Sequence, residues 1–357
     1  MRKTSLFLSF LFLITVVLSA CFNSPRAESV LSQAESIFQS IDNSSQITSQ
    51  VTSQVTSRVT SEATSKVSVS IMAKLNYTAF GDSIARGAGL VNPETNCYPA
   101  IVLTKLKALQ SVEQIKYQNF AIDGQTSPQL LEQLKTKGDV IAKSDIITIS
   151  TGANNILGVF LAQAAKIFDK YGFAMNDVLN VGSIFSDIFS GAPDPTTYQK
   201  LLQIFTELNN YIESDEYDVQ IATAAAQLRS DLPKIVAEIR SRNKDAIIIV
   251  NTIYNPYKHL AIKMGNISLF SPADETENAV VALNQVINEE QKKLGYIIAP
   301  VYEGFNAYKG NERLENAYFS FESLRATNID VHPSIAGHKL IADIVYETIF
   351  QTIIKSS

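Results

Sequence analysis

The sequence predicts an α/β fold from Ile71 onward, a single doubly wound domain built on a parallel sheet. Short apolar runs alternate there with longer segments in which apolar residues recur three and four positions apart. Polar and glycine-containing motifs follow several of the runs, at the edge where open parallel sheets bind their ligands. Strands separated by helices imply right-handed crossovers, so helices should cover both faces of the sheet.

Five short apolar runs are the expected strands. They are Leu75 to Phe80, Lys116 to Ala121, Asp145 to Ser150, Ala246 to Thr252 and Tyr296 to Val301. The expected helices are Tyr98 to Gln110, Ser127 to Thr136, Asp218 to Arg242, Glu275 to Leu294 and Ser334 to Ile354. This alternation predicts one sheet in one domain, residues 71–357.

The composition argues against one class of partner. The chain has 357 residues, of which 46% are apolar, and a formal net charge of -5. Its basic residues are dispersed and form no stripe that could follow a phosphate backbone, which disfavours nucleic-acid binding. The apolar content is sufficient for at least one full core.

The amino terminus has the pattern of a secretory signal. A basic start precedes an apolar run from Leu6 to Leu18, which is short for a membrane span, and small residues lead from it to Cys21. The tetrapeptide Leu-Ser-Ala-Cys that ends at Cys21 resembles the lipobox of bacterial lipoproteins. The resemblance implies removal of residues 1–20 and a diacylglycerol on Cys21, which would anchor an exported protein to the outer face of the cell membrane. An ordinary signal or an uncleaved anchor is the alternative.

Residues 21–70 are expected to form a stalk between this anchor and the domain. Ser, Thr and Gln dominate the segment, a short amphipathic helical pattern runs from Val30 to Ile41, and a four-residue repeat follows from Val51. So little apolar surface favours a solvated linker. A coiled coil or an adhesive strand repeat is the alternative. With Cys21 lipidated, Cys97 is the remaining thiol of the two cysteines, and we expect it to be buried.

Four motifs fall at predicted strand ends or before the last helix. They are Gly81-Asp82-Ser83, Asp123-Gly124, Gly152-Ala153-Asn154-Asn155 and Asp330-Val331-His332. Taken alone, Gly-Asp-Ser also suits a simple turn. A nucleophilic serine needs a base, an acid that orients the base and donors for the oxyanion. The chain has only three histidines, so the base has few candidates.

Together the motifs resemble those of the SGNH, or GDSL-type, hydrolase family, over essentially all of residues 71–357. The resemblance implies a flavodoxin-like three-layer α/β/α sandwich with a five-stranded parallel sheet. It also implies an esterase that acts on carboxylic esters, including lipid, acetyl-sugar and thioester substrates, without a metal or cofactor.

The resemblance also implies roles for individual residues. Ser83 would be the nucleophile and His332 the general base. The backbone N–H groups of Ser83 and Gly124 and the side-chain amide of Asn154 would form the oxyanion hole. Asp330 is the candidate acid.

Two positions depart from the family pattern. The acid usually lies three residues before the histidine, where this chain has Ile329, whereas Asp330 lies two before it. A backbone carbonyl or a water molecule is therefore an alternative to Asp330 for orienting His332. Asn155 stands where relatives often have an aspartate, and we expect it to alter only the hydrogen bonding around Asn154.

The other candidate residues have structural interpretations. We expect Asp82 to be a turn former or a partner for backbone N–H groups, His338 to be structural, and His259 to lie on the surface or the rim of the cleft. The histidines and the free cysteine have no metal-ligand spacing. The Gly-x-Ser-x-Gly and Gly-x-Gly-x-x-Gly motifs are absent, which disfavours the α/β-hydrolase elbow and a dinucleotide site.

Residues 156–215 form a long, apolar helical insertion directly after the third motif. The segment is either a lid that shapes an acyl pocket or an additional helical layer of the core, and both interpretations stay open. The prediction for the whole chain is a monomeric, lipid-anchored serine esterase. The alternative is a surface binding protein that kept the fold, lost the chemistry and recognises cell-wall glycans.

Overall fold

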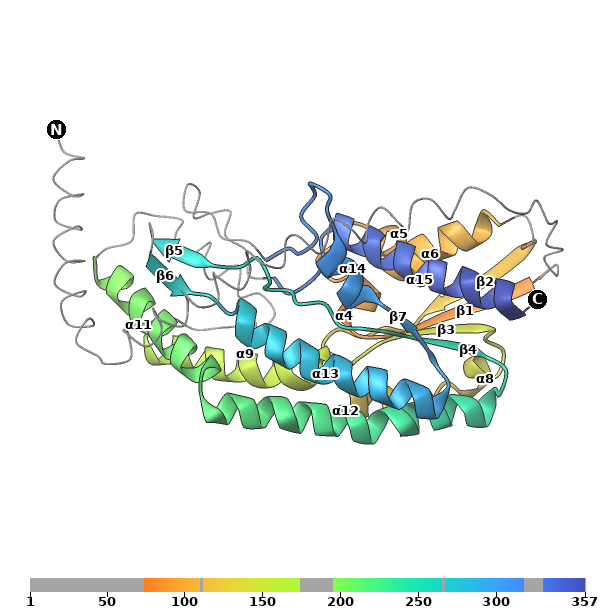
Figure 1. Cartoon of the computed structure of the whole chain (residues 1–357), viewed down its shortest axis with the longest axis horizontal. Coiled ribbons are helices and arrows are strands. Elements are labelled where there is room, and N and C mark those ends of the chain that lie inside the picture. Colours follow the sequence, from red (N-terminus) through yellow and green to blue (C-terminus); the bar gives the residue numbers. More distant parts are fainter. Residues whose placement is uncertain (1–73, 110–111, 174–194, 265–266, 318–329, 357) are drawn as a thin grey trace, which may run out of the picture. The chain divides into compact units, whose positions relative to one another are not determined.

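The computed structural model describes residues 74–109, 112–173, 195–264, 267–317 and 330–356 (Figure 1). These ranges belong to one compact unit, Val69–Ser357. The predicted signal, the lipidation site at Cys21 and the stalk lie outside the described residues and stay predictions.

Five strands form one parallel sheet at the centre of this unit. They are β1 (Lys74–Gly81), β2 (Gln114–Asn119), β3 (Ile146–Ser150), β4 (Ile247–Asn251) and β7 (Ile297–Ala299). The order is β2-β1-β3-β4-β7, and every neighbouring pair is parallel. All five lie within two residues of their expected bounds, so the predicted α/β fold with a five-stranded parallel sheet is confirmed.

Helices cover both faces of the sheet (Figure 1). One face carries α6 (Tyr98–Lys107), α14 (Val301–Ala307) and α15 (Ile335–Ser356). The other carries α7 (Ser127–Lys135), α9 (Ala153–Lys170), α12 (Asp215–Arg242) and α13 (Ala273–Leu294), and α11 (Pro195–Ile212) packs against α9 and α12. Three helices of a single turn, α4 (Ser83–Arg86), α5 (Pro93–Asn96) and α8 (Gly138–Ile141), lie in the connections.

The strands separate two hydrophobic cores because successive side chains point to opposite faces. Ile147 and Ile149 of β3 pack in the core beneath α12 and α13, whereas Ile146 packs in the core beneath α6 and α15. These three side chains are fully buried. Burying one such side chain stabilises the fold by about 1.5 to 3 kcal/mol, so this alternation fixes the register of the sheet.

Local signals fix the ends of the long helices. The hydroxyl oxygen of Ser214 accepts a hydrogen bond from the backbone N–H of Tyr217 at the start of α12. Gly295 ends α13 in the left-handed conformation, with φ 69°. No described helix combines the length and the apolar character needed to cross a membrane.

The sequence prediction did not include an antiparallel hairpin formed by β5 (Ile262–Met264) and β6 (Ile267–Phe270). It lies between β4 and α13 in the chain, and β6 contacts α11. Both ends of the predicted insertion are helical, in α9 and α11, and both helices contribute to the core. Residues 174–194 lie outside the described part of the chain.

Candidate active site

Ser83 follows directly from the carboxyl end of β1 as the first residue of α4. The turn that presents it depends on Gly81, whose φ is 138°. A Cβ at this position would lie 2.3 Å from the backbone oxygen of Ser150 in the neighbouring strand. Only glycine fits there, and the close contact holds the serine at the edge of the sheet.

Asp82 is buried beside the nucleophile and caps α4. Its Oδ1 accepts hydrogen bonds from the backbone N–H of Ile84, at 3.1 Å, and from the hydroxyl of Ser150, at 2.9 Å. Burial raises the pKa of Asp82 to about 6, although the hydrogen bonds act in the opposite direction. The predicted role of Asp82 as a partner for a backbone N–H is confirmed.

Asp330 lies beside the imidazole of His332. Its Oδ1 is 2.5 Å from His332 Nδ1 and also accepts the backbone N–H of His332 at 3.1 Å. Burial alone would raise the pKa of Asp330, but the hydrogen bonds and the charge of His332 outweigh it and hold that pKa below its ordinary value. An ionised carboxylate can only accept, so the ring proton belongs on Nδ1 and leaves Nε2 with a free lone pair.

Two residues that the sequence analysis did not identify hold this loop. Asn316 Nδ2 donates to the other carboxylate oxygen of Asp330 at 3.1 Å, and its backbone N–H donates to the His332 carbonyl at 3.1 Å. The hydroxyl of Tyr254 donates to the carbonyl of Val331 at 2.7 Å. The Tyr254 ring stacks on Phe305 with centroids 4.4 Å apart. Neither residue belongs to a motif, so no local signal pointed to them.

Two of the candidate oxyanion donors, Gly124 and Asn154, are connected through the turn after β2. Gly124 has φ 70°, and a Cβ built there would find nothing within 4 Å, so its surroundings are open. Asn154, near the start of α9, donates from Nδ2 to the carbonyl of Gln125 at 3.2 Å. Its neighbour Asn155 is hydrogen-bonded to both the backbone N–H and the hydroxyl of Ser127, which fixes the start of α9 against α7.

The other two histidines are separate from this chemistry. His338 is fully buried, accepts the backbone N–H of Tyr98 at 3.3 Å, and has its pKa lowered to about 3 by burial. It is therefore neutral and structural, as expected. His259 is exposed, as its position in a loop predicted. Cys97 is a free, buried thiol, which confirms the prediction for it.

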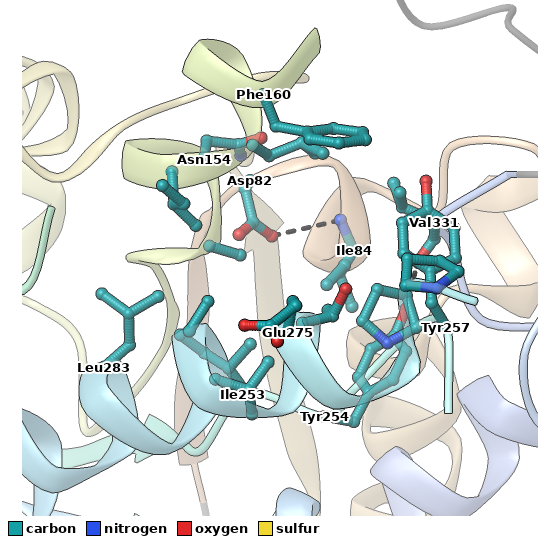
Figure 2. Close-up of a pocket in the computed structure, with 18 of the residues that line it drawn as sticks. Asp82, Ile84, Asn154, Phe160, Ile253, Tyr254, Tyr257, Glu275, Leu283 and Val331 are labelled. Carbon is teal, nitrogen blue, oxygen red and sulfur yellow. Dashed lines mark hydrogen bonds between the residues drawn. The ribbon is translucent and has the colours of Figure 1, made fainter. Parts of the chain in front are cut away.

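Ser83 and Asn154 line one pocket, which we call the catalytic pocket (Figure 2). It holds about 800 Å³ of space, open solvent included. Its walls come mainly from α9, α13 and the loop after β4, and most of the lining side chains are apolar. Val331, the residue before His332, also lines it, whereas His332 and Gly124 are not among the lining residues.

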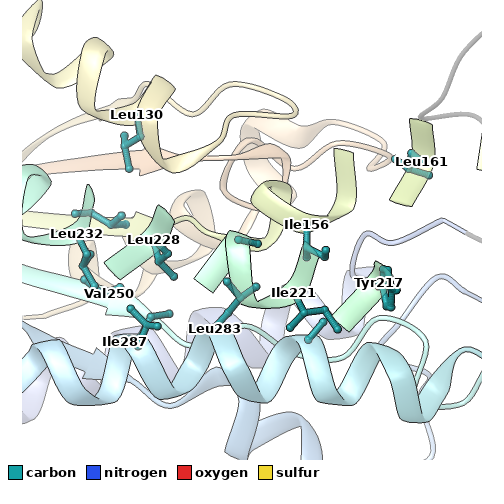
Figure 3. Packing of buried hydrophobic residues seen from close by; sticks show 14 of the residues in the cluster. Leu130, Ile156, Leu161, Tyr217, Ile221, Leu228, Leu232, Val250, Leu283 and Ile287 are labelled. Atoms are coloured by element: carbon teal, nitrogen blue, oxygen red, sulfur yellow. The ribbon is translucent and has the colours of Figure 1, made fainter. Parts of the chain in front are cut away.

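The far wall of the catalytic pocket is part of the hydrophobic core. Ile156 of α9, Tyr217 of α12 and Leu283 of α13 line the pocket and also belong to the core cluster (Figure 3). The pocket is therefore shaped by the packing of helices and has the rigidity of a core. Such a cavity beside a serine and a small number of polar groups is typical of a ligand site.

The chain is similar to several known proteins. The chain is 23% identical over 274 residues to the uncharacterised protein YpmR of Bacillus subtilis, an alignment that covers 76% of this chain and 80% of that protein. The crystal structure of the lipase Lip_vut3 from a goat rumen metagenome matches with a TM-score of 0.45 and 18% identity, covering 77% of this chain and 97% of the lipase. A catalytic mutant of Axe2, an acetylxylan esterase from Geobacillus stearothermophilus, matches with a TM-score of 0.41 and 17% identity, covering 77% and 94% of the two chains.

The family comparison covers most of the domain. Residues 79–340 match the GDSL-like Lipase/Acylhydrolase family, a range that contains every candidate catalytic residue. The chain belongs to the GDSL-like lipase/acylhydrolase family.

Proposed function

We propose that this protein is a serine esterase that hydrolyses carboxylic esters carrying an apolar acyl group. The observation that carries the proposal is the position of Ser83 in the wall of a largely apolar pocket, together with Asn154. The pocket offers an acyl chain burial along α9 and α13, and each methylene group buried there contributes about 0.8 kcal/mol.

In the proposed reaction, Ser83 Oγ attacks the ester carbonyl carbon while His332 Nε2 takes the hydroxyl proton. Asp330 keeps the imidazole in the required tautomer and stabilises the imidazolium. The oxyanion receives hydrogen bonds from the backbone N–H groups of Ser83 and Gly124 and from Asn154 Nδ2. Removing one such donor typically raises the barrier by about 2.7 to 4 kcal/mol.

In the remaining steps His332 acts first as an acid and then again as a base. The imidazolium gives its proton to the leaving alkoxide, which departs as an alcohol and leaves an acyl group on Ser83. His332 then takes a proton from water, whose oxygen attacks the acyl carbon. Collapse of this second oxyanion intermediate releases the carboxylic acid and returns the proton to Ser83.

The alternative of an inactive binding protein rested on the unusual spacing of the acid. The 2.5 Å separation of Asp330 and His332 removes that reason, because the acid reaches the ring from two residues away. We therefore retain the esterase as the single proposed function.

The experiment is the substitution Ser83→Ala in the mature chain, assayed with p-nitrophenyl butyrate and octanoate. We expect the loss of at least about three orders of magnitude in kcat, because the nucleophile is absent. The thermal midpoint should be nearly unchanged, since only a hydroxyl is removed. Ser241→Ala, on the exposed end of α12, is the matched control and should be fully active. Wild-type activity in Ser83→Ala, or no labelling of the wild type by a fluorophosphonate probe, would refute the proposal.

We also propose that the enzyme acts at the outer face of the cell membrane, held there by a lipid on Cys21. The lipobox-like end of the signal and the polar stalk support this location. Labelling of cells with an alkyne fatty acid should mark the wild type but not Cys21→Ser, and the variant should leave the membrane fraction. Equal labelling of both would exclude lipidation at Cys21.

A further inference from the structure

A second apolar pocket, which we call the inner pocket, lies farther along α9. Its walls include Leu161, Ala164 and Phe168 of α9, Phe205 and Leu208 of α11, and Phe270 of β6. It holds about 450 Å³ of space, open solvent included. Of the described residues that line it, only Tyr257 has a polar side-chain atom, and none is charged. No step of the proposed reaction uses this space.

The catalytic pocket and the inner pocket share two side chains, Phe160 and Tyr257. These two aromatic rings therefore form the partition between the pockets. Phe160 lies at the edge of the catalytic pocket in Figure 2, projecting from α9. It is half-buried, and its ring is 6.5 Å from that of Tyr211 and 6.4 Å from that of Tyr217.

Helix α9 lines both pockets, and the catalytic pocket, which contains Ser83, lies at the start of the helix. Asn154, Leu157 and Phe160 line the catalytic pocket at helical spacing, and Leu161, Ala164 and Phe168 continue into the inner pocket. At a rise of about 1.5 Å per residue, the axis advances about 9 Å from Asn154 to Phe160 and about 12 Å from Phe160 to Phe168. An apolar chain that starts at Ser83 and follows α9 therefore meets Phe160 before it can reach the inner pocket.

We propose that Phe160 sets the upper limit of the acyl chain, with the inner pocket as an unused extension behind it. The inference rests on the proposed esterase function. The ligand assigned to the inner pocket is the distal part of a long acyl chain. An apolar occupant suits it because the lining is apolar apart from one tyrosine hydroxyl, so a polar group would lose its hydration there with little compensation. The catalytic pocket then favours acyl chains that end at the Phe160 ring.

The test compares Phe160→Ala with the wild type on p-nitrophenyl esters from butyrate through octanoate to palmitate in the same mixed micelles. Removing the ring joins the two pockets, and each further methylene that becomes buried raises the affinity by about fourfold. We expect the ratio of kcat/KM for palmitate to that for octanoate to rise by at least about tenfold. Phe160→Leu should raise it by a smaller factor and serves as the test if the alanine variant does not fold.

Two further variants test whether the change in the palmitate-to-octanoate ratio depends on the inner pocket. Ala164 is buried and lines the inner pocket but not the catalytic pocket. Adding Ala164→Phe to Phe160→Ala fills the opened space and should return the ratio to near the wild-type value. Phe350→Ala removes another half-buried, stacked ring, from α15 on the opposite face of the sheet, and should leave the ratio unchanged.

The outcomes separate this inference from the function on which it rests. A wild type that hydrolyses no ester overturns both. A wild type that hydrolyses esters, with folded Phe160 variants whose palmitate-to-octanoate ratio is unchanged, overturns only the role of Phe160. The same variants are also assayed with acetate esters of long alcohols, and a change confined to these esters would assign the inner pocket to the alcohol and overturn the acyl assignment. A rise in the ratio that Ala164→Phe reverses supports the inference.

Discussion

The nucleophile and the base of the candidate active site are held in different ways. Ser83 is fixed by the main chain, through the end of a buried strand and a glycine packed against the next strand. His332 is held by one main-chain hydrogen bond, from the N–H of Asn316, and by side chains, namely Asp330, Asn316 and a tyrosine hydroxyl on the adjoining carbonyl. The first arrangement is part of the fold, and the second is added to a loop that precedes α15.

The acid next to the nucleophile, Asp82, and the acid next to the base, Asp330, also differ in the direction of their pKa shifts. Burial raises the pKa of Asp82, whereas the hydrogen bonds and charge of His332 prevail over burial and lower the pKa of Asp330. Near neutral pH both carboxyl groups are ionised. The surroundings of Asp330 favour its charged form, whereas burial disfavours the charged form of Asp82. Substitutions in the main-chain turn that presents Ser83 should therefore mainly lower stability, and substitutions of the side chains that hold His332 should mainly lower activity.

Asp330→Asn should have the largest effect, and mainly on activity. An amide at this position no longer fixes the Nδ1 proton or stabilises the imidazolium, and a comparable substitution in a serine protease lowers kcat by about 10⁴-fold. We expect a loss of that order in kcat for p-nitrophenyl octanoate, with a decrease of only about 1 kcal/mol in the free energy of unfolding. Asp343→Asn on α15 is the exposed control and should be fully active. If Asp330→Asn keeps more than about a tenth of kcat, a carbonyl or water orients the ring instead.

Gly81→Ala should have the next largest effect, on stability. The new Cβ would lie 2.3 Å from a backbone oxygen and would require φ 138° in a residue that disfavours it. We expect a decrease of about 3 kcal/mol or more in the free energy of unfolding, measured by urea titration. Gly158→Ala in α9, where a Cβ meets nothing within 4 Å, should instead be neutral or stabilising by up to about 1 kcal/mol. Equal stabilities of the two variants would contradict the main-chain constraint at Gly81.

The smallest expected effect is a pH dependence that originates at Asp82. Its pKa is about 6 in the folded protein and 3.8 ordinarily. The unfolded chain therefore loses this proton first, and the associated stability is present below about pH 4 and lost as the pH rises through 6. Relative to Asp82→Asn, the wild type should lose about 2 kcal/mol of unfolding free energy between pH 4 and pH 7. Parallel stability profiles for the two proteins would show that Asp82 does not titrate in this range.

The sheet was predictable because its strands carry their own signals. Runs such as Ile146 to Ser150 are short, apolar and bounded by polar residues, and the buried parallel strands that they form need nothing else to identify them. The β5–β6 hairpin was missed although Gly265-Asn266 separates its two short apolar strands, a spacing that favours a two-residue turn. Its strands are too short to stand out from the loop sequence around them.

The active site was predictable only in part, because some of its contacts come from residues that are distant in the sequence. Gly81, Asp82 and Ser83 form a local turn whose geometry follows from adjacent residues. Asn316 and Tyr254 reach the base from other parts of the chain. Asn316 acts through its side-chain amide and its backbone N–H, and Tyr254 acts through its hydroxyl. The partition at Phe160 depends on packing among α9, α11 and α12, which helical periodicity alone does not specify.

The spacing of Asp330 and His332 gives the base a property of its own. One carboxylate oxygen accepts both the ring and the backbone N–H of the same histidine, which closes a small ring of bonds within three residues. Asp330 and the His332 imidazole therefore keep a fixed position relative to each other. A displacement of this loop would therefore change the position of Nε2 while the tautomer of His332 stayed fixed.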